Sequence, residues 1–515
     1  MARASSKRAP ASVAPRASDD TSFGAALLII LAIPRLMRIF YPQVWVEDDF
    51  YLESAWLVSA GMRPYLDFVH PHFPLLEFIT AGYLKIFGAG HFTIEVLNET
   101  AIYLTSLLSF KLARRVSTRR AAISAAILYA SSSLVFRYHV YERECFVAPL
   151  LLIATLLALE ETVSYRRLSW IALALSTACL IKLTAFVAVA PIVAFVALIQ
   201  KRRRDAILLV IAIVSAIVIA ALICYAAYGR EFVFQTLIFH FMKGRNFPGL
   251  MGPLGVLDIQ LPLFVIGCYA ARREMRTDSA LMLVLAMVAP QYVFYSILSP
   301  TFWAHNFLEG LPFVTVIGGI GVDWMLDRIV ETSWMALAGG LTLIVISLIW
   351  IAPLTNESWA VHSIYGFGYL DRAEVSHISK ALHDASGPDE DVIAPAFICF
   401  QANRREFIRF PETYGVLREA EIEYERDGFA RAREHLGDED FFRLIANTAH
   451  FWRDPILDAI RDKKVNAIIL DSSIQMLPLV LPPLMLPQDV AQMMIENGFR
   501  PVEQTEHYVL WKRSS

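Results

Sequence analysis

Charged residues are scarce in this sequence, and no excess of basic residues is present. Only 18% of the 515 residues are Asp, Glu, Lys or Arg, and 56% are hydrophobic, whereas an ordinary soluble domain has roughly 25% charged residues. The mean hydropathy is +0.48. Lys and Arg number 46 against 49 acids and occur in short scattered clusters. Without a concentrated basic surface, a nucleic-acid partner is excluded.

Cysteine is also scarce, and no internal repeat or low-complexity tract is present outside the N-terminal tail. The five cysteines fall mostly inside apolar runs, without CxxC or Cys/His spacing. This pattern excludes the common zinc modules and a disulfide framework. We interpret the cysteines as small core residues.

Long apolar runs are what the sequence has in abundance. Residues 206–228 (AILLVIAIVSAIVIAALICYAAY) contain no charged side chain, and about 20 apolar residues cross a bilayer as a helix. The chain is therefore predicted to be a polytopic α-helical membrane protein with about 11 transmembrane helices. They are expected at residues 22–40, 95–113, 120–136, 146–163, 169–183, 185–199, 206–228, 256–271, 279–298, 305–323 and 336–354.

The loop charges predict an orientation. The stretches KLARRVSTRR, SYRRLS, QKRRRD and ARREMRTD alternate with the other loops, and short cytoplasmic loops carry an excess of Lys and Arg. We therefore expect a multi-pass protein of the plasma (inner) membrane with a cytoplasmic N-terminus. Residues 1–21 would form a disordered cytoplasmic tail, and the run after it resembles an uncleaved helix, because Arg35 and Arg38 stand where a cleavage site would be.

The composition changes after the last apolar run. DVIAPA and VNAIILD are typical of buried strands, helical patterns occupy residues 374–385 and 488–497, and a longer helical stretch covers 415–463. Residues 356–515 are therefore predicted to form an extracytoplasmic (periplasmic) α/β domain, and residues 22–355 a transmembrane catalytic domain.

Three consecutive acids, Glu47, Asp48 and Asp49, follow an apolar run in YPQVWVEDDFYLESAW. Clustered charges at a membrane boundary are costly to desolvate and usually serve a function. Their mutual repulsion makes one of them a better proton acceptor, as a general base requires. The alternative is that they are solvated loop residues at the end of a helix.

The residues after the triplet favour the functional interpretation. Residues 50–58 have the apolar spacing of a helix, Gly61 would end it, and aromatic, proline and histidine residues follow. Such a helix suits the membrane interface, so the first outer loop is predicted to contain interfacial helices. The triplet would then lie at the depth of lipid phosphates.

The order Tyr51, Ala55, Gly61, Pro64-Tyr65, Asp67 and His72-Phe73-Pro74-Leu75 resembles the first extracytoplasmic loop of the C-type glycosyltransferases. This superfamily includes protein O-mannosyltransferases and lipid A aminoarabinose transferases. Its members carry Asp-Glu before the tyrosine, whereas Glu47 and Asp48 stand here in swapped order. The catalytic carboxylate therefore stays open among the three acids, with Asp48 favoured and Glu47 next.

Three further stretches are similar to the same superfamily. YERECFVAPLLLIATL, with Arg143 and Glu144, resembles the region leading into its fourth span. CLIKLTAFVAVAPIV resembles its Leu-Thr-Lys motif and places Lys182 at the lysine. FWAHNFLEGLPFVTVIGGIGV, with His305, resembles the start of a late span, with Asn306 replacing a tyrosine.

The resemblance implies a hexosyl- or pentosyltransferase that moves a sugar from a polyprenyl-phosphate donor to a hydroxyl of an extracytoplasmic acceptor. The acceptor's class, lipid, glycan or protein, stays open. A first-loop carboxylate would be the base, and cations would bind the phosphate. The candidate substrate-binding residues are Tyr51, Tyr65, Asp67, His72, Arg143, Glu144, Lys182, His240, Lys243, Arg245 and His305.

Three of these candidates come from the layout of the middle loop, FQTLIFHFMKGRNFPGL, on the predicted outer side. His240, Lys243 and Arg245 would meet the donor phosphate there. Contact with lipid headgroups is the alternative, although outer cations are less expected under the positive-inside rule.

The remaining charged candidates have plain structural alternatives. Lys182 would extend to the interface without another role. His305 would be a structural hydrogen-bonding group at a helix start, and Arg143 with Glu144 an ordinary ion pair at a helix end.

No cofactor or metal site is predicted. His70 and His72 flank a proline, which is poor ligand geometry, and no second ligand cluster is evident. A loosely bound divalent cation stays open.

Two other functions compete with the transferase. A lipid or solute transporter or flippase would commonly show internal symmetry and charges at the membrane midplane, and neither is clear here. The swapped acids also leave room for an inactive relative or a subunit that presents an acceptor.

Overall fold

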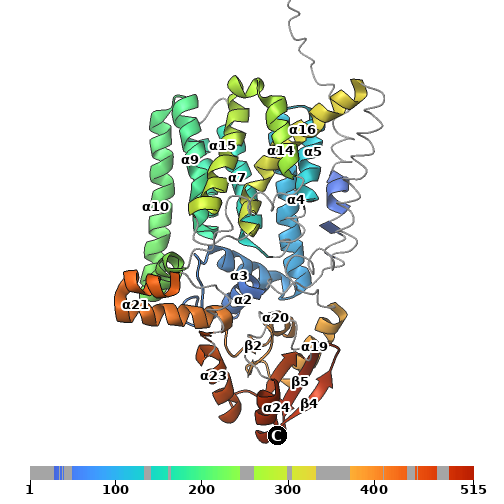
Figure 1. The fold of residues 1–515 in the computed structure, drawn as a ribbon, viewed down its shortest axis with the longest axis vertical. Helices are drawn as coiled ribbons and strands as arrows, with labels where there is room; N and C mark the ends of the chain where they lie inside the picture. The colour runs from blue at the N-terminus through green and yellow to red at the C-terminus, as the bar shows by residue number, and fades with distance from the viewer. Residues whose placement is uncertain are drawn as a thin grey trace, which may run out of the picture.

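A helical bundle and a smaller α/β part make up the described structure (Figure 1). The last predicted span, residues 336–354, and most of the first lie outside the residues that this computed structural model describes. Those residues are 28–33, 35–36, 39, 49–132, 141–160, 164–243, 260–298, 304–331, 372–409, 411–437, 447–448, 450–471 and 487–514.

The helices of the bundle coincide with predicted apolar runs. They are α4 (His91–Val116), α5 (Arg119–Ala130), α7 (Arg143–Ala158), α8 (Tyr165–Ile181), α9 (Val189–Ala194), α10 (Arg203–Tyr228), α14 (Gln260–Ala271), α15 (Ser279–Val293) and α16 (Leu311–Glu331). Short 3-10 and π segments extend them at η2 (Leu183–Ala188), η3 (Phe195–Ile199), η6 (Phe294–Leu298) and η7 (Ala304–Glu309).

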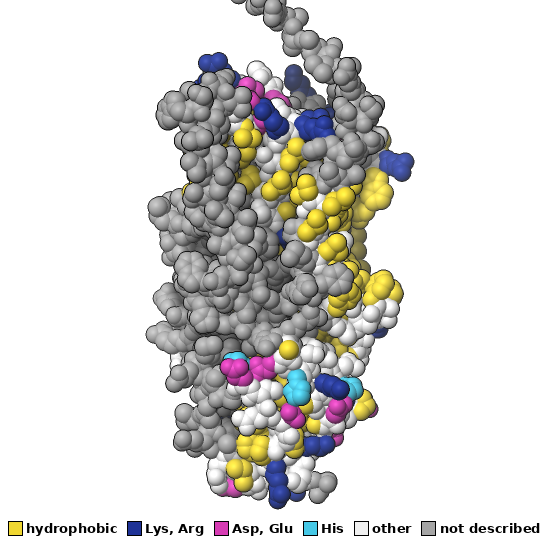
Figure 2. Space-filling model, turned by 90° about the vertical axis from the view of Figure 1, so that its right-hand side faces the viewer, with side chains coloured by type: hydrophobic (Ala, Val, Ile, Leu, Met, Phe, Trp, Pro, Cys, Tyr) yellow, Lys and Arg dark blue, Asp and Glu magenta, His cyan; other side chains and the backbone are white. Residues whose placement is uncertain are grey.

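Two stretches of the described chain, Arg203–Tyr228 and Ser279–Leu298, are long and apolar enough to cross a bilayer. Apolar side chains along α10 are exposed, including Ile211 and Leu222 at 54% and 61%. Such a surface suits contact with lipid rather than water. Figure 2 shows hydrophobic side chains in a band below an end where Lys and Arg gather. The total of eleven spans stays a prediction.

The single lysine in the run of residues 169–199 marks a real break. Helix α8 ends at Ile181, and Lys182 has an extended backbone (φ −145°, ψ 112°). Pro191 does not divide the run, because it lies in the first turn of α9, where a missing backbone donor costs little. The break turns the Lys182 side chain into the bundle, where it is buried.

Glycine allows close packing of the bundle helices. A Cβ on Gly267 of α14 would lie 2.0 Å from the carbonyl oxygen of Ile317 in α16. A Cβ on Gly319 would similarly lie 2.3 Å from the carbonyl oxygen of Ala121 in α5. Small residues at such crossings let helix backbones approach in membrane proteins.

The first loop forms two helices, α2 (Asp49–Ser59) and α3 (Leu75–Phe87), which lie between the bundle and the α/β part (Figure 1). Helix α2 confirms the predicted helix at residues 50–58. It ends at Ser59, and Gly61 follows with a φ of 89°, which is left-handed and therefore favours glycine.

The C-terminal part combines helices with a small sheet. Strands β3 (Ala467–Asp471), β5 (Tyr508–Arg513) and β4 (Phe499–Gln504) pair antiparallel in that order. Strands β1 (Asp391–Val392) and β2 (Arg405–Glu406) form a parallel pair, and Ile393 bridges to Ile468 of β3. The helices are α19 (Arg372–Ala385), α20 (Ala396–Ala402), α21 (Pro411–Gly437), α23 (His450–Arg461) and α24 (Pro487–Glu496).

These elements confirm several predictions for the C-terminal part. VNAIILD forms β3, DVIAPA contributes a two-residue strand, and helices cover residues 374–385 and most of 488–497. In the described part of the predicted helical stretch at 415–463 lie α21 and α23, and α21 is kinked at Gly428, where φ is 75°.

The α/β part contacts the first loop and the end of α10. Trp56 of α2 packs edge-on against Phe400, with ring centroids 6.1 Å apart, and its indole donates to Asn403 at 3.3 Å. Beyond α10 follow α11 (Arg230–Val233), η4 (Phe234–Ile238) and α12 (Phe239–Met242). Arg230 pairs with Glu421 at 3.3 Å and with Glu425, both on α21.

Candidate functional site

Buried charged side chains gather where the first loop meets the bundle. The segment 65–77, the start of α7, the break at Lys182, η7 and α12 each contribute to this cluster. The first loop and the middle loop therefore meet, as the predicted topology requires.

Arg143 is the centre of one half of the cluster. Its guanidinium is buried, pairs with Glu77 of α3, and donates to the carbonyl oxygen of Ile181 at 2.9 Å. It also lies 4.7 Å from the ring centre of Tyr51. A buried guanidinium is costly unless it is paired and hydrogen-bonded, so these contacts fix its position under the first loop.

Glu77 ties the first loop to this arginine. Its second carboxylate oxygen lies 3.3 Å from Nε2 of His70, whose Nδ1 lies 3.4 Å from the Ser54 hydroxyl. Burial would raise the pKa of Glu77, but Arg143 and His70 outweigh that effect and hold the pKa below its usual value. Glu77 is thus held as a carboxylate.

Lys182 is the centre of the other half. Its ammonium binds the carboxylate of Glu144, donates to the amide oxygen of Asn306 at 2.7 Å, and lies 3.2 Å from Glu309. Tyr295 donates to Glu309 at 3.1 Å. Lys182 therefore joins α7 to η7 and does not extend to the interface.

Arg143 and Glu144 do not pair with each other, contrary to the ion pair that the sequence left open. Arg143 points to Glu77, and Glu144 points to Lys182. The two neighbours at the start of α7 therefore anchor the two halves of the cluster separately.

Glu142, Glu144 and His305 could together offer ligands to a metal ion, since one atom of each lies within 4.8 Å of the others. His305 lies 3.7 Å from both carboxylates. The ammonium of Lys182, however, already binds Glu144 and compensates its charge. This arrangement fits a lysine-centred cluster better than a dedicated metal site, and the absence of a cofactor stays a prediction.

His72 and His240 bring the two loops together. Their ring centroids are 5.3 Å apart, and Nε2 of His240 donates to the carbonyl oxygen of Pro71 at 2.6 Å. The Tyr51 hydroxyl lies 3.4 Å from Nε2 of His72.

This contact lies in a positive environment. Burial lowers the pKa of His72 well below its usual value, and the positive charges of Arg143 and Lys243 lower it further. Burial and the charge of Lys243 lower the pKa of His240 to about 3, so both imidazoles are neutral at physiological pH.

Lys243 is half-buried at the end of α12. Its ammonium lies 4.9 Å from the ring centre of Phe239, and burial lowers its pKa to about 8. No carboxylate of the described residues pairs with it in the contacts of the structure, in contrast to Arg143 and Lys182. Among the candidate cations it is therefore the one without a charge partner inside the described part of the chain.

Tyr65 and Asp67 have different positions. The Tyr65 hydroxyl donates to the carbonyl oxygen of His72 at 2.5 Å, and φ of Tyr65 is 67°, so this residue shapes the loop next to the cluster. Asp67 instead pairs with Arg63 at 3.0 Å on the surface, and this pairing lowers its pKa. Asp67 is not part of the buried cluster.

The remaining predicted site residues are only partly covered. Glu47, Asp48 and Arg245 lie outside the described residues. Asp49 is the first residue of α2, and its side chain is not among those that the structure describes. Asp49 stands two residues before Tyr51 in the chain, and the choice of base among the three acids stays a prediction.

Several polar residues of the site were not among the predicted site residues: His70, Glu77, Glu142, Tyr295, Asn306 and Glu309. Glu77 and Glu309 are the acids of otherwise apolar stretches, LLEFITAGY and NFLEGLPF. A lone acid in an apolar run is itself a signal, because burying it requires a partner.

A family model matches part of the helical bundle, and solved structures match the whole fold. A family model described as dolichyl-phosphate-mannose-protein mannosyltransferase matches residues 69–228, which contain Arg143 and Lys182. No curated protein matches the chain by sequence.

Solved structures match along nearly the full length. ArnT from Cupriavidus metallidurans in the apo state is similar with a TM-score of 0.63 at 13% identity, covering 96% of this chain and 98% of that chain. The same protein bound to undecaprenyl phosphate gives a TM-score of 0.57 at 12% identity, with coverages of 96% and 98%. The Archaeoglobus fulgidus oligosaccharyltransferase tethered with an acceptor peptide gives 0.51 at 14% identity, with coverages of 90% and 70%.

The chain has the fold of the C-type glycosyltransferases, and the resemblance drawn from the first loop is confirmed. Within that class its fold is similar to ArnT and to the archaeal oligosaccharyltransferase.

Proposed function

We propose that the protein is an integral membrane glycosyltransferase that moves a sugar from a polyprenyl-phosphate donor to the hydroxyl of an acceptor. The observation that carries the proposal is the placement of the cations Arg143 and Lys243 around the paired rings of His72 and His240, where the first and middle loops meet. A positive site lined by neutral imidazoles and a half-buried lysine suits an anion that arrives at the membrane boundary.

The proposed reaction forms one bond to the anomeric carbon and breaks another. The acceptor oxygen attacks the anomeric carbon, and the bond from that carbon to the phosphate oxygen breaks. The polyprenyl phosphate leaves with the electron pair, and the acceptor proton passes to a first-loop carboxylate, for which Asp48 is favoured and Glu47 is next. Asp49 is the third candidate.

Cations near the leaving phosphate lower the barrier, because negative charge develops on its oxygens in the transition state. Lys243 is the proposed direct phosphate ligand, with Arg245 as its neighbour in the chain. His240, His72 and Tyr51 would line the site. Arg143, Glu144, Lys182 and His305 are assigned to holding its walls, since the first three are engaged in buried pairs.

The relatives support a lipid-linked donor. The ArnT structure with undecaprenyl phosphate has this fold, and the matching family is described by dolichyl-phosphate-mannose. Whether the sugar is a hexose or a pentose is left open by this proposal.

The location follows from the charged ends of the bundle. We place the Arg-rich turns and residues 1–21 in the cytoplasm, the catalytic helices of 22–355 in the plasma (inner) membrane, and residues 356–515 outside. The pairing of Arg120 with Asp323 at 2.8 Å, at the end of the bundle where α4 ends and α5 begins, is consistent with a compact cytoplasmic rim.

Donor binding tests the proposal directly. Purified full-length protein in nanodiscs is mixed with undecaprenyl phosphate, and binding is followed by native mass spectrometry for the wild type, Lys243→Gln and Lys85→Gln. Lys85 is an exposed lysine of α3 and serves as the matched control. We expect binding by the wild type and the control, and about tenfold weaker binding by Lys243→Gln. Equal binding by all three would contradict the phosphate site.

A transporter would behave differently. It would move the polyprenyl-phosphate sugar across liposomes without transferring the sugar. Radiolabelled donor in proteoliposomes separates the two functions, because transfer yields labelled acceptor or free sugar, whereas transport yields intact donor on the other side.

A further inference from the structure

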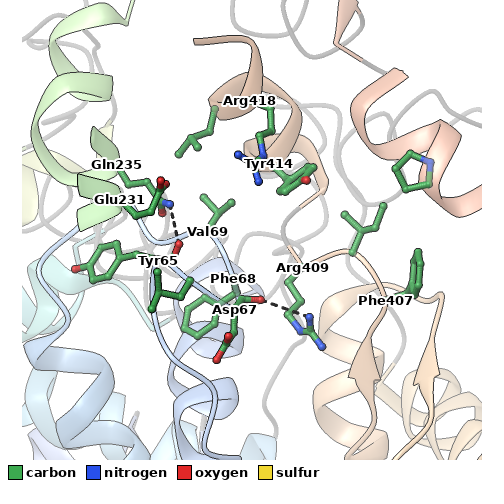
Figure 3. Close-up of a pocket in the computed structure, with 14 residues that line it drawn as sticks. Tyr65, Asp67, Phe68, Val69, Glu231, Gln235, Phe407, Arg409, Tyr414 and Arg418 are labelled. Atoms are coloured by element: carbon green, nitrogen blue, oxygen red, sulfur yellow. Dashed lines mark hydrogen bonds between the residues drawn. The ribbon is translucent and has the colours of Figure 1, made fainter. Parts of the chain in front are cut away.

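A cavity lies beside residues 65–69 of the first loop, apart from the charged cluster. It has a volume of about 330 Å³ and is lined by three segments that are distant in sequence. These are the loop residues 65–69, the start of the segment after α10, and residues of the C-terminal part between 407 and 455 (Figure 3). Ligand sites often form at such junctions between parts of a protein.

The walls of the cavity combine rings with balanced charges. Phe407 and Tyr414 are partly exposed and supply aromatic surface, whereas Tyr65 and Phe68 border the cavity but are buried. Two carboxylates, Asp67 and Glu231, face two guanidinium groups, Arg409 and Arg418. The charged groups therefore cancel, which disfavours a polyanion such as a bare phosphate chain.

Such walls match the surface of a sugar. The apolar C–H face of a sugar ring packs on aromatic side chains, and its hydroxyls donate to carboxylates and accept from guanidinium groups. Each of the four charged groups already has an ion-pair partner in the protein, but a fully apolar lipid chain would still remove their remaining contact with water without offering a hydrogen bond. The volume lies at the lower end of ligand pockets, roughly 300–1,000 Å³, which suits one or two sugar units.

The polar groups are held in place by the fold. Arg409 donates to the backbone carbonyl of Asp67 at 3.5 Å, and this contact spans the loop and the C-terminal part (Figure 3). The Arg418 guanidinium lies 5.4 Å from the ring centre of Tyr414. The carboxylate of Glu231 and the side chain of Arg418 stay partly exposed, so a ligand can reach them.

One buried glutamine connects the cavity to the charged cluster. Gln235 lines the cavity and donates to the carbonyl oxygen of Tyr65 at 3.0 Å. Its amide oxygen accepts from the backbone N–H of His70 at 2.9 Å, and His70 contacts Glu77. A ligand in the cavity would therefore rest on the loop that also borders the proposed donor site.

We propose that this cavity binds a neutral saccharide unit of the acceptor, so that the acceptor is a glycan. This inference rests on the proposed transferase function and assigns acceptor choice to Tyr414 and Arg418 of α21 together with Glu231. The C-terminal part then selects the acceptor through these side chains, while the first loop carries out the chemistry.

The test uses the full-length protein in nanodiscs. Saturation-transfer NMR is recorded with methyl mannoside, methyl glucoside, methyl arabinoside and the corresponding disaccharides, and with a Ser/Thr-rich peptide. The variants are Tyr414→Ala and Arg418→Gln, with Arg433→Gln as a matched control, because Arg433 is an exposed arginine of the same helix outside the cavity. Binding of undecaprenyl phosphate is measured on each preparation.

We expect at least one saccharide to bind the wild type and Arg433→Gln, and to bind the two cavity variants about tenfold more weakly, while undecaprenyl phosphate binds all four proteins. If undecaprenyl phosphate binds but no saccharide does, or if saccharides bind all four proteins equally, the cavity proposal is overturned and the donor site stands. Peptide binding that depends on Tyr414 would also overturn it. If saccharides bind as expected but undecaprenyl phosphate does not, the cavity assignment stands as a saccharide site and the proposed donor fails.

Discussion

The ammonium of Lys182 donates to the amide oxygen of Asn306 at 2.7 Å, across 124 residues of sequence. Asn306 occupies the place where the superfamily motif has a tyrosine. An amide oxygen gives the lysine a third acceptor beside Glu144 and Glu309, so the substitution is compatible with a buried ammonium. The pair links the break after α8 to η7 and thereby holds the wall of the site.

Replacing Lys182 by Met should destabilise the protein strongly. Glu144 and Glu309 are buried and would lose their counter-charge, and breaking a buried pair by removing one partner costs about 3–5 kcal/mol. Thermal unfolding in nanodiscs measures the loss. The double variant Lys182→Met/Glu144→Gln should recover part of it, because one uncompensated charge is removed. A single variant as stable as the wild type would contradict the pairing.

Replacing Glu77 by Gln should weaken activity and also lower the stability of the protein, because the buried guanidinium of Arg143 loses its carboxylate partner. Arg143 keeps its carbonyl acceptors but loses its carboxylate, so its position beneath Tyr51 becomes less defined. We expect transfer to fall about tenfold or more, with kcat affected more than the KM for the donor, and Glu160→Gln, an exposed acid, to behave as the wild type. A fall in stability with unchanged kcat in the folded fraction would show that Glu77 is structural only.

The lowered pKa of Lys243 leads us to expect that donor binding depends on pH. Burial lowers its pKa from 10.5 to about 8, so its charge is present below that pH and is lost as the pH rises through it. Affinity for undecaprenyl phosphate should therefore fall above about pH 8. Lys243→Arg should retain affinity at that pH, because guanidinium stays charged. An affinity of the wild type that is constant across this range would contradict the role of Lys243.

Glu53 lies at the contact between α2 and the C-terminal part. Its raised pKa leads us to expect that the stability of the protein depends on pH. Burial raises its pKa from 4.5 to about 7, although a hydrogen bond with Glu406 and the charge of Arg409 act in the opposite direction. The folded protein thus holds a proton that the unfolded chain releases in this window. The contribution of the protonated Glu53 carboxyl to the stability is complete below pH 4.5 and is lost as the pH rises through about 7.

Thermal unfolding between about pH 5 and pH 8 measures this effect. Glu53→Gln removes the titrating group, so we expect its melting temperature to decline less with rising pH than that of the wild type. Glu434→Gln, an exposed acid of α21, serves as the control and should follow the wild type. Parallel curves for Glu53→Gln and the wild type would rule out this assignment.

The helices were predictable because each apolar run is a local property of the chain. The break at Lys182 was also visible, since a single lysine interrupts a run of about thirty apolar residues, long enough for more than one crossing. The kink at Gly428 in α21 was not, because similar mixed charges stand on both sides of this glycine.

The pairing of the charged residues could not be read from local pattern. Arg143 finds Glu77, 66 residues earlier in the chain, rather than its neighbour Glu144. Only the packing of α3 against α7 decides between these partners. The first-loop motif, by contrast, correctly indicated the fold, because it is a compact set of residues.

The most direct measurement of the central claim is sugar transfer from a radiolabelled polyprenyl-phosphate sugar by the purified protein in nanodiscs. A panel of donors is supplied with glycan acceptors, and the double variant Glu47→Gln/Asp48→Asn is compared with the wild type. The account predicts labelled acceptor with the wild type and loss of transfer in the double variant, with donor binding retained. Undiminished transfer by the double variant would contradict the first-loop base, and no transfer from any donor by the wild type would contradict the enzyme itself.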